Sequence, residues 1–355
     1  MDSVISTFKE RIRQAAADGK KLRIQGGNTK HFYGEHPASL NVLDTSEYAG
    51  VVSYEPSELV VTVRCGTLLA ELEQLLSTRG QCLAYEPPHF GASATVGGMV
   101  AAGLAGPARA SVGGVRDHVL GAKLINGLGE ELTFGGQVMK NVAGFDVSRL
   151  MVGSLGTLGL ILEVSLKVLP LPVAQATLRF QLPQDKALET MNRWAGKPLP
   201  VTATSWEDQV LTVRLAGAEA AVRSACGTLG GERLPDSEAA AHWTGLKDQK
   251  LPFFDGEFPL WRFSLPSTAA PLNLPGGVLV EWGGAQRWLR GAQDLGTLRD
   301  LARQAGGHAT LFRGVDRAAG VFTPLPMPLA AIQQRLKHAF DPHGVFNRGR
   351  MFPDL

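Results

Sequence analysis

Glycine placement constrains the fold of this chain more than any other feature of its sequence. The 355 residues include 42 glycines, and 16 of them lie between residues 91 and 160. No Gly-X-Y period and no low-complexity run accompanies this cluster. Glycine lets a backbone adopt positive φ angles and approach a neighbour closely. So dense a cluster inside a folded chain predicts a backbone that wraps around a ligand.

Composition excludes several classes of protein. Hydrophobic residues make up 44% of the chain and charged residues only 19%, which rules out a disordered chain. The formal net charge of +2 is too small to indicate nucleic acid as the main partner. The length is sufficient for two or three compact units.

The cysteines and the apolar runs predict a protein of a reducing, cytoplasmic compartment. The three cysteines, Cys65, Cys82 and Cys226, form no CxxC pair, which argues against iron–sulfur, zinc-finger and disulfide frameworks. The N-terminus lacks the pattern of a signal peptide. The longest weakly polar run, residues 95–108, is too short to span a bilayer.

Hydrophobic periodicity divides the chain into three parts. In residues 1–172 we expect a mixture of strands and helices. The strands are expected at 22–25 and 59–65, a helix at 68–76 and a hairpin from 119–125 to 130–134. Asp146 is expected to cap a short helix that ends at Leu150. Residues 173–325 alternate strands and helices and contain all six tryptophans. A proline-rich stretch then leads into residues 326–355, with a helix at 329–340.

The glycine loops fit neither of the best-known nucleotide motifs. The first strand is followed by Gly26-Gly27-Asn28-Thr29-Lys30 rather than GxGxxG, and GxxxxGK[ST] is absent. Two segments nevertheless resemble anion cradles. The loop 26–29 can present successive N–H groups to a phosphate, and Thr95-Val96-Gly97-Gly98 opens a predicted helix through Ala102. Either loop alone is explained as well by a tight turn.

The order of segments resembles the FAD-binding domain of the vanillyl-alcohol oxidase/PCMH flavoprotein family. The similarity rests on residues 86–89, 95–107, 115–121, 140–146, 153–160 and 340–351. Within that family the segments are similar to those of glycolate oxidase FAD-binding subunits. The resemblance implies an α+β fold: a PCMH-type FAD-binding domain of two α/β subdomains (1–172), a smaller α+β cap domain for substrate or partner docking (173–325), and a C-terminal segment that returns to the FAD domain (326–355).

The resemblance also implies which residues bind FAD. The loops 26–30 and 95–98 would hold the pyrophosphate, residues 153–161 would pass beside the adenine, and Asn347 would lie near the isoalloxazine ring. The full set of expected FAD-binding residues is Gly26, Gly27, Asn28, Thr29, Lys30, Pro88, Thr95, Val96, Gly97, Gly98, Ala102, Val115, Asp117, Gly121, Lys140, Asn141, Gly156, Gly159, Leu160, Ile161 and Asn347. Some relatives tether FAD through a histidine in the first loop. Residues 26–29 contain no histidine or cysteine, so we expect noncovalent FAD.

Catalytic residues are harder to predict from the sequence. Oxidation of a 2-hydroxy acid needs a base for the hydroxyl proton and cations for the carboxylate. His308 and Arg313 are the candidates, although a surface histidine and a solvated arginine are the simpler interpretation. None of the eight histidines forms HxH or HxxxH, so no metal site is expected.

The resemblance implies that this chain is the FAD-binding subunit of a glycolate oxidase complex. The expected reaction converts glycolate to glyoxylate, and the expected partners are a larger flavin-containing subunit and an iron–sulfur subunit. Any membrane association would arise through those partners. Two alternatives stay open: a stand-alone FAD-dependent 2-hydroxy-acid dehydrogenase, and a structural subunit that has lost its flavin. The sequence also leaves open whether this flavin meets glycolate directly.

Overall fold

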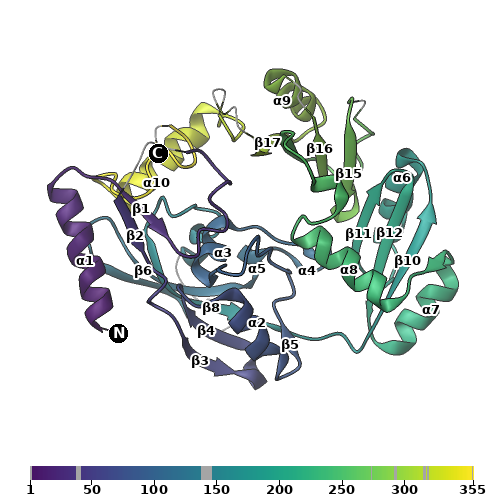
Figure 1. Ribbon diagram of the computed structural model, residues 1–355, viewed down its shortest axis with the longest axis horizontal. Coiled ribbons are helices and arrows are strands. Elements are labelled where there is room, and N and C mark those ends of the chain that lie inside the picture. The colour runs from purple at the N-terminus through teal and green to yellow at the C-terminus, as the bar shows by residue number, and fades with distance from the viewer. Residues whose placement is uncertain are drawn as a thin grey trace. The chain divides into compact units, whose positions relative to one another are not determined.

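The computed structural model describes residues 2–36, 41–136, 146–272, 274–291, 294–314, 317, 320–353 and 355. The chain divides into two compact units (Figure 1). Unit 1 contains Met1–Leu104, Gly114–Pro170 and Pro324–Leu355, and unit 2 contains Ala105–Gly113 and Leu171–Thr323. The predicted boundaries at 172 and 325 lie two residues from the chain crossings at 170 and 323. The short excursion Ala105–Gly113 had no counterpart in the sequence prediction.

Unit 1 is built on a five-stranded antiparallel sheet. Its order is β3 (Val51–Glu55), β4 (Val60–Arg64), β8 (Leu160–Lys167), β6 (Val119–Ile125) and β7 (Glu131–Gly135). Strand β8 is central, and six of its eight residues are buried, which explains its nearly continuous apolar sequence. Two small sheets flank it: parallel β1 (Leu22–Gln25) and β2 (Asn41–Asp44), and antiparallel β5 (Gln81–Cys82) and β9 (Leu169–Pro170).

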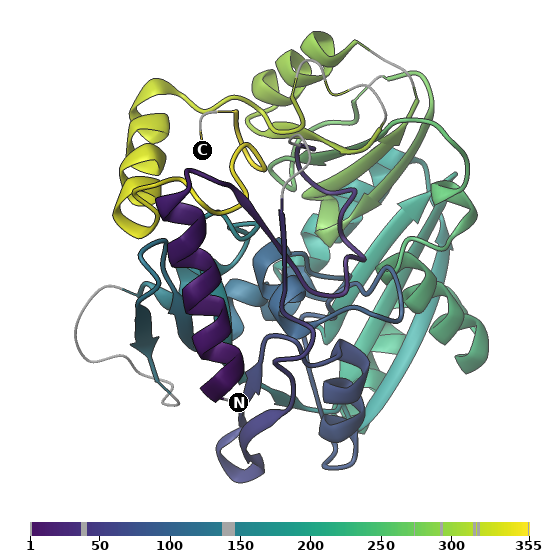
Figure 2. The ribbon, with the colours of Figure 1, turned by 60° about the vertical axis from the view of Figure 1, so that its left-hand side comes forward.

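The helices of unit 1 follow the predicted periodicities. They are α1 (Asp2–Ala17), α2 (Leu69–Ser77), α3 (Val96–Ala102), α5 (Val115–His118) and α10 (Met327–Phe340), with 3-10 turns η1 (Pro56–Glu58) and η2 (Ser148–Met151). Helix α1 buries Ile5, Phe8, Ile12 and Ala15, which recur at three- and four-residue spacing. The C-terminal segment returns to the N-terminal elements of the same unit, as the yellow and purple ribbons of Figure 2 show, and Phe346 bridges to Leu22.

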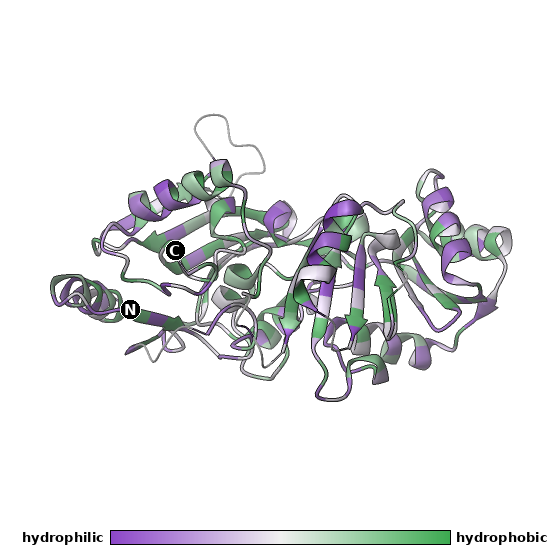
Figure 3. Ribbon diagram, turned by 90° about the horizontal axis from the view of Figure 1, so that it is seen from above, coloured by the Kyte–Doolittle hydropathy of each residue, from purple (hydrophilic) through white to green (hydrophobic). Residues whose placement is uncertain are grey.

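Unit 2 is built on an eight-stranded antiparallel sheet. Its order is β13 (Glu232–Arg233), β10 (Ala174–Gln181), β12 (Val210–Gly217), β11 (Val201–Glu207), β15 (Gly277–Glu281), β16 (Gln286–Arg290), β14 (Leu260–Ser264) and β17 (His308–Arg313). Figure 3 shows hydrophobic stretches along the strands of each unit's sheet. The helices are α4 (Arg109–Val112), α6 (Gln184–Ala195), α7 (Glu219–Leu229), α8 (Asp236–Lys247) and α9 (Leu295–Gln304), with η3 (Pro252–Phe254) and η4 (Trp282–Gly284).

Most predicted elements are confirmed within a few residues, but one predicted cap is wrong. The short helix after Asp146 begins at Ser148, and no side chain caps it. Asp146 instead accepts a hydrogen bond from the Ser148 hydroxyl and forms an ion pair with Arg149. The Asp146 carboxylate therefore interacts with the side chains of Ser148 and Arg149 and does not accept from free backbone amides of the helix. In the described part of the chain, no helix is long and apolar enough to cross a membrane.

Candidate functional site

A pocket in unit 1 opens where strand β1 ends in the loop 26–31. Its volume is about 870 Å³, including the space open to solvent. Four segments line it: residues 23–31, helix α3, the turn 155–161 and the C-terminal tail at Asn347 and Arg350. These segments are far apart in the sequence, so only the fold brings them together.

Glycines Gly26 and Gly27 are required because the loop packs against the chain before α3. A Cβ atom on Gly26 would lie 2.4 Å from Thr95 Oγ1, and a Cβ atom on Gly27 would lie 1.4 Å from the Ser93 carbonyl oxygen. The Ser93 hydroxyl also donates to the Gly27 carbonyl at 2.7 Å. A side chain at Gly27 would need the Ser93 backbone to move, and one at Gly26 would collide with the Thr95 side chain, so the two glycines set the wall of the pocket.

The loop 26–29 provides the predicted anion cradle. Among the described residues, the backbone amides of Gly26, Gly27, Asn28 and Thr29 donate to no protein acceptor. Asn28 adopts a left-handed conformation with a φ of 57°. A left-handed residue in such a loop lets successive amides turn toward one anion. This loop can therefore supply a row of donors to a phosphate.

At the second predicted cradle, the start of α3, three backbone amides already have acceptors within the protein. The amides of Val96, Gly97 and Gly98 already donate to the Thr67 carbonyl, the Cys65 carbonyl and Thr95 Oγ1, at 2.9, 2.8 and 3.2 Å. Thr95 caps its own helix, so these three amides are used within the protein. Helix α3 contributes a wall of small residues instead, because Gly97, Gly98, Ala101 and Ala102 line the pocket.

The charge of the pocket is one-sided. Its described lining includes Arg23, Lys30 and Arg350 but no aspartate or glutamate. Within the described chain, Arg23 Nε is buried without a hydrogen-bond partner. A buried donor without a partner is costly, but this atom is closed off from the pocket, so the fit to an anion rests on the charges of the lining. The pocket fits an anionic ligand that carries hydrogen-bond acceptors.

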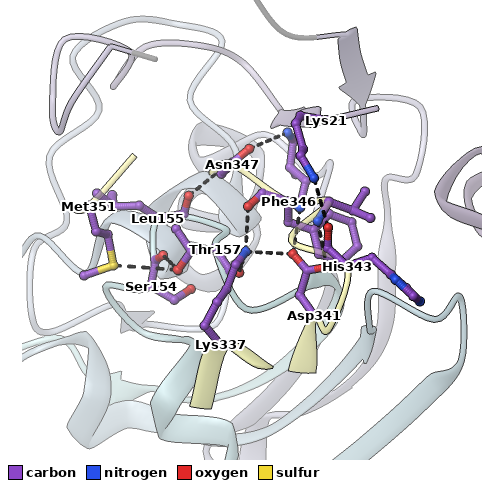
Figure 4. Close-up of polar contacts among 12 residues, drawn as sticks. Lys21, Ser154, Leu155, Thr157, Lys337, Asp341, His343, Phe346, Asn347 and Met351 are labelled. Atoms are coloured by element: carbon purple, nitrogen blue, oxygen red, sulfur yellow. Dashed lines mark hydrogen bonds and ion pairs between the residues drawn. The ribbon is translucent and has the colours of Figure 1, made fainter. Parts of the chain in front are cut away.

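The C-terminal tail closes the pocket through Asn347 (Figure 4). Its side-chain oxygen accepts from the Ile24 amide at 2.8 Å, and its side-chain nitrogen donates to the Leu155 carbonyl at 2.6 Å. Arg350 donates to the carbonyls of His31 and Glu35, each at 2.7 Å. Asn347 and Arg350 thus connect the tail to the segment 23–35 and to the turn 155–161.

Several residues of the pocket were missed by sequence reasoning, among them His31 and Cys65. His31 lines the pocket one residue beyond the predicted loop, and Cys65 lines it from the end of β4. Burial raises the pKa of the Cys65 thiol to about 12, so this cysteine is a neutral, apolar part of the wall. No local motif marks these two residues, because their place depends on how β1, β4 and α3 pack.

The predicted FAD-binding residues separate into three groups. The residues that line the pocket are Gly26, Gly27, Asn28, Thr29, Lys30, Thr95, Gly97, Gly98, Ala102, Gly156, Gly159, Leu160, Ile161 and Asn347. The residues that do not line it are Pro88, Val96, Val115, Asp117 and Gly121. Lys140 and Asn141 lie outside the described residues.

The residues outside the pocket have structural roles. Val96 and Val115 are buried in the core, as is Pro88. Asp117 accepts from the Gly114 amide at 2.8 Å and so caps the turn that begins α5. A Cβ atom on Gly121 would lie 2.7 Å from the Gly136 carbonyl oxygen, so this glycine allows β6 and β7 to pair.

The predicted catalytic pair is not brought together. His308 and Arg313 are the first and last residues of β17, with His308 exposed and Arg313 half-buried. Five strand steps separate their Cα atoms by about 16 Å, too far for both side chains to act on a two-carbon acid. Among the described residues, no three histidine, cysteine, aspartate or glutamate side chains are arranged to hold a metal ion.

Comparison with known proteins identifies the family. Residues 5–135 match the model of an FAD binding domain. The chain is 48% identical over 346 residues to glycolate oxidase subunit GlcE of Escherichia coli K12, and the match covers 98% of this chain and 97% of that protein. The chain belongs to the GlcE family of glycolate oxidase subunits. The predicted family and the α+β fold with a PCMH-type FAD-binding domain are confirmed.

One more distant relative shares part of the chain, and a solved structure shares its fold. Glycolate oxidase subunit GlcD of Bacillus subtilis 168 is 30% identical over 166 residues, which cover 46% of this chain and 35% of that protein. The solved structure of an alkyldihydroxyacetonephosphate synthase superposes with a TM-score of 0.66 and covers 95% of this chain and 74% of that one. At 16% sequence identity, this likeness concerns the fold alone.

Proposed function

We propose that this chain is the FAD-binding subunit of a glycolate oxidase complex. Unit 1 would bind FAD noncovalently, and unit 2 would be the cap that docks substrate or partners. The observation that carries the proposal is the pocket itself, in which four amides and three cations meet without a described carboxylate. A pyrophosphate is the part of FAD that needs such surroundings.

The residues of the pocket suggest how FAD would be held. The amides of Gly26, Gly27, Asn28 and Thr29 would donate to the pyrophosphate, and Lys30 would neutralise it. The small residues of α3 and of the turn 155–161 would admit flat rings between backbone segments. When bound, FAD supplies the hydride acceptor for oxidation of a CH–OH group.

The complex would oxidise glycolate to glyoxylate and pass the electrons to an iron–sulfur subunit, beside a larger flavin-containing subunit. GlcE of Escherichia coli is itself a glycolate oxidase subunit, which supports a multi-subunit assembly. We propose a cytoplasmic location, with any membrane contact made through the partner subunits. The base remains unassigned, because His308 and Arg313 lie at opposite ends of one strand.

A spectrum and an activity assay test this proposal. The purified chain should show flavin absorption, and acid precipitation should release all of the yellow colour into the supernatant. Glycolate oxidation with a dye acceptor should require the partner subunits. Turnover by the chain alone would favour a stand-alone 2-hydroxy-acid dehydrogenase. A chain that neither contains nor binds FAD would be the structural subunit, and the proposal would then be wrong.

A further inference from the structure

The chain leaves unit 1 directly after a wall of the FAD pocket. Helix α3 ends at Gly103, whose φ is 63°, and Ala105–Gly113 then belongs to unit 2. The chain re-enters unit 1 at Gly114, where Asp117 fixes the start of α5. The excursion is short, and both of its ends are capped. Few residues lie between this segment and α3, so a displacement of the segment is transmitted to α3.

Trp282 of unit 2 makes two contacts with this segment. The Trp282 indole N–H donates to the Gly106 carbonyl at 3.0 Å, and the Arg109 guanidinium lies 4.5 Å from the centre of the Trp282 ring. Helix α4, which includes Arg109, also packs on β11 and η4. A hydrogen bond and a cation–π contact therefore act on the same nine residues.

The backbone at Trp282 is held in an unfavourable conformation. Trp282 has a φ of 54°, and the next two residues, Gly283 and Gly284, have φ angles of 66° and 108°. The left-handed region is disfavoured for a bulky residue, and such strain persists only when its surroundings impose it. The Gly283 amide donates to Thr204 Oγ1 at 2.9 Å, which anchors the turn to β11. The strained turn presents the indole to Gly106.

We propose that Trp282 is a positioning residue for the FAD pocket and acts through Ala105–Gly113 on α3. The inference rests on the proposed function of unit 1. Trp282 holds the segment, the segment continues directly from Gly103, and α3 presents Gly97, Gly98, Ala101 and Ala102 to the cofactor. A change of unit 2 that moves Trp282 would thereby change the affinity of unit 1 for FAD.

The test compares Trp282→Phe with a matched control. Phenylalanine keeps a ring beside Arg109 but removes the donor to Gly106. The control is Trp243→Phe, because Trp243 also lies in unit 2, donates to Thr177 Oγ1 at 3.0 Å and has the Arg214 guanidinium 5.2 Å from its ring centre. We expect Trp282→Phe to raise the Kd for FAD about three- to thirtyfold, the range typical of mutations that act through a packed network, and Trp243→Phe to leave it unchanged.

Hydrogen exchange of the FAD-free chain provides a second readout. Faster exchange of the amides in residues 96–103 is expected in Trp282→Phe and not in Trp243→Phe. Arg109→Gln, a change of an exposed side chain that threatens folding less, should shift both readouts in the same direction by a smaller factor. Equal effects of the two tryptophan variants, or no effect on either readout, would overturn the inference. Failure of the wild-type chain to bind FAD would instead refute the proposed function, while the exchange comparison would still decide the role of Trp282.

Discussion

The ammonium of Lys337 lies 2.7 Å from a carboxylate oxygen of Asp341, and both side chains are buried (Figure 4). Lys337 also donates to the carbonyls of Thr157 and Phe346, at 2.7 and 2.9 Å. Asp341 accepts from the amides of Val345 and Phe346, each at 2.8 Å. The pair thus joins α10 to the tail and to the turn that lines the FAD pocket.

Removal of one partner of this pair should be costly. Burial lowers the pKa of Lys337, while Asp341 opposes that shift. Lys337→Gln leaves a buried carboxylate without its countercharge, and we expect a loss of about 3 kcal/mol in the free energy of unfolding. Denaturant titration of both chains measures the loss. Lys186→Gln, which removes an exposed pair with Glu189, should change it little. A similar change in the two variants would contradict the structural role of Lys337.

Glu131 should make the stability of the chain sensitive to acid. It pairs with Lys123 and Lys9, and their hydrogen bonds lower its pKa below the ordinary value of 4.5. A carboxylate with a lowered pKa stabilises the fold fully above pH 4.5, and the contribution disappears as the pH falls through the lowered pKa. Glu131→Gln should therefore cost about 1 kcal/mol at pH 7 and less at about pH 3. Thermal unfolding at both pH values checks this, and a loss that is independent of pH would count against the ion pairs.

Alanine substitutions at two glycines of the turn 153–156 would distinguish the cost of backbone strain from the cost of steric crowding. Both have left-handed backbones, with φ angles of 79° at Gly153 and 72° at Gly156. A Cβ atom on Gly153 would meet nothing within 4 Å, whereas one on Gly156 would lie 2.6 Å from Asn347 Nδ2. Gly153→Ala should cost about 1 kcal/mol in stability. Gly156→Ala should cost more and should also weaken FAD binding, because Asn347 must move. Isothermal titration with FAD measures the difference, and equal FAD affinities would show that Asn347 does not shape the pocket.

Arg23 should contribute to FAD affinity, although sequence reasoning did not select it. Arg23 lines the pocket, and no aspartate or glutamate of its described lining neutralises it, so a bound anion would gain a charge-assisted interaction with this side chain. Arg23→Gln should raise the Kd for FAD about tenfold, which corresponds to about 1.4 kcal/mol. The exposed Arg193 of unit 2 is the control, and Arg193→Gln should leave the Kd unchanged. An unchanged Kd in Arg23→Gln would remove Arg23 from the site.

Local patterns were sufficient for most elements and for the first loop of the pocket. The strand 22–25 and the loop after it can be predicted because Gly26-Gly27 interrupts the apolar strand pattern and permits a tight turn. Helix α3 could be predicted from the segment Thr95-Val96-Gly97-Gly98, and Thr95 is its N-cap. The donors of α3 could not be predicted, since the carbonyls of Cys65 and Thr67 occupy them only after β4 packs beside this helix.

The sequence by itself determined the family, the order of strands and helices, and a glycine-rich backbone suited to a large flat ligand. These properties depend on residue type and spacing, which are local. Only the tertiary structure decided which groups face that ligand. Arg23, His31 and Arg350 join the pocket through long-range packing, whereas Val115 and Asp117 leave it for the core and a cap. The same packing sets Trp282 against Gly106, because contacts between distant segments depend on the whole fold.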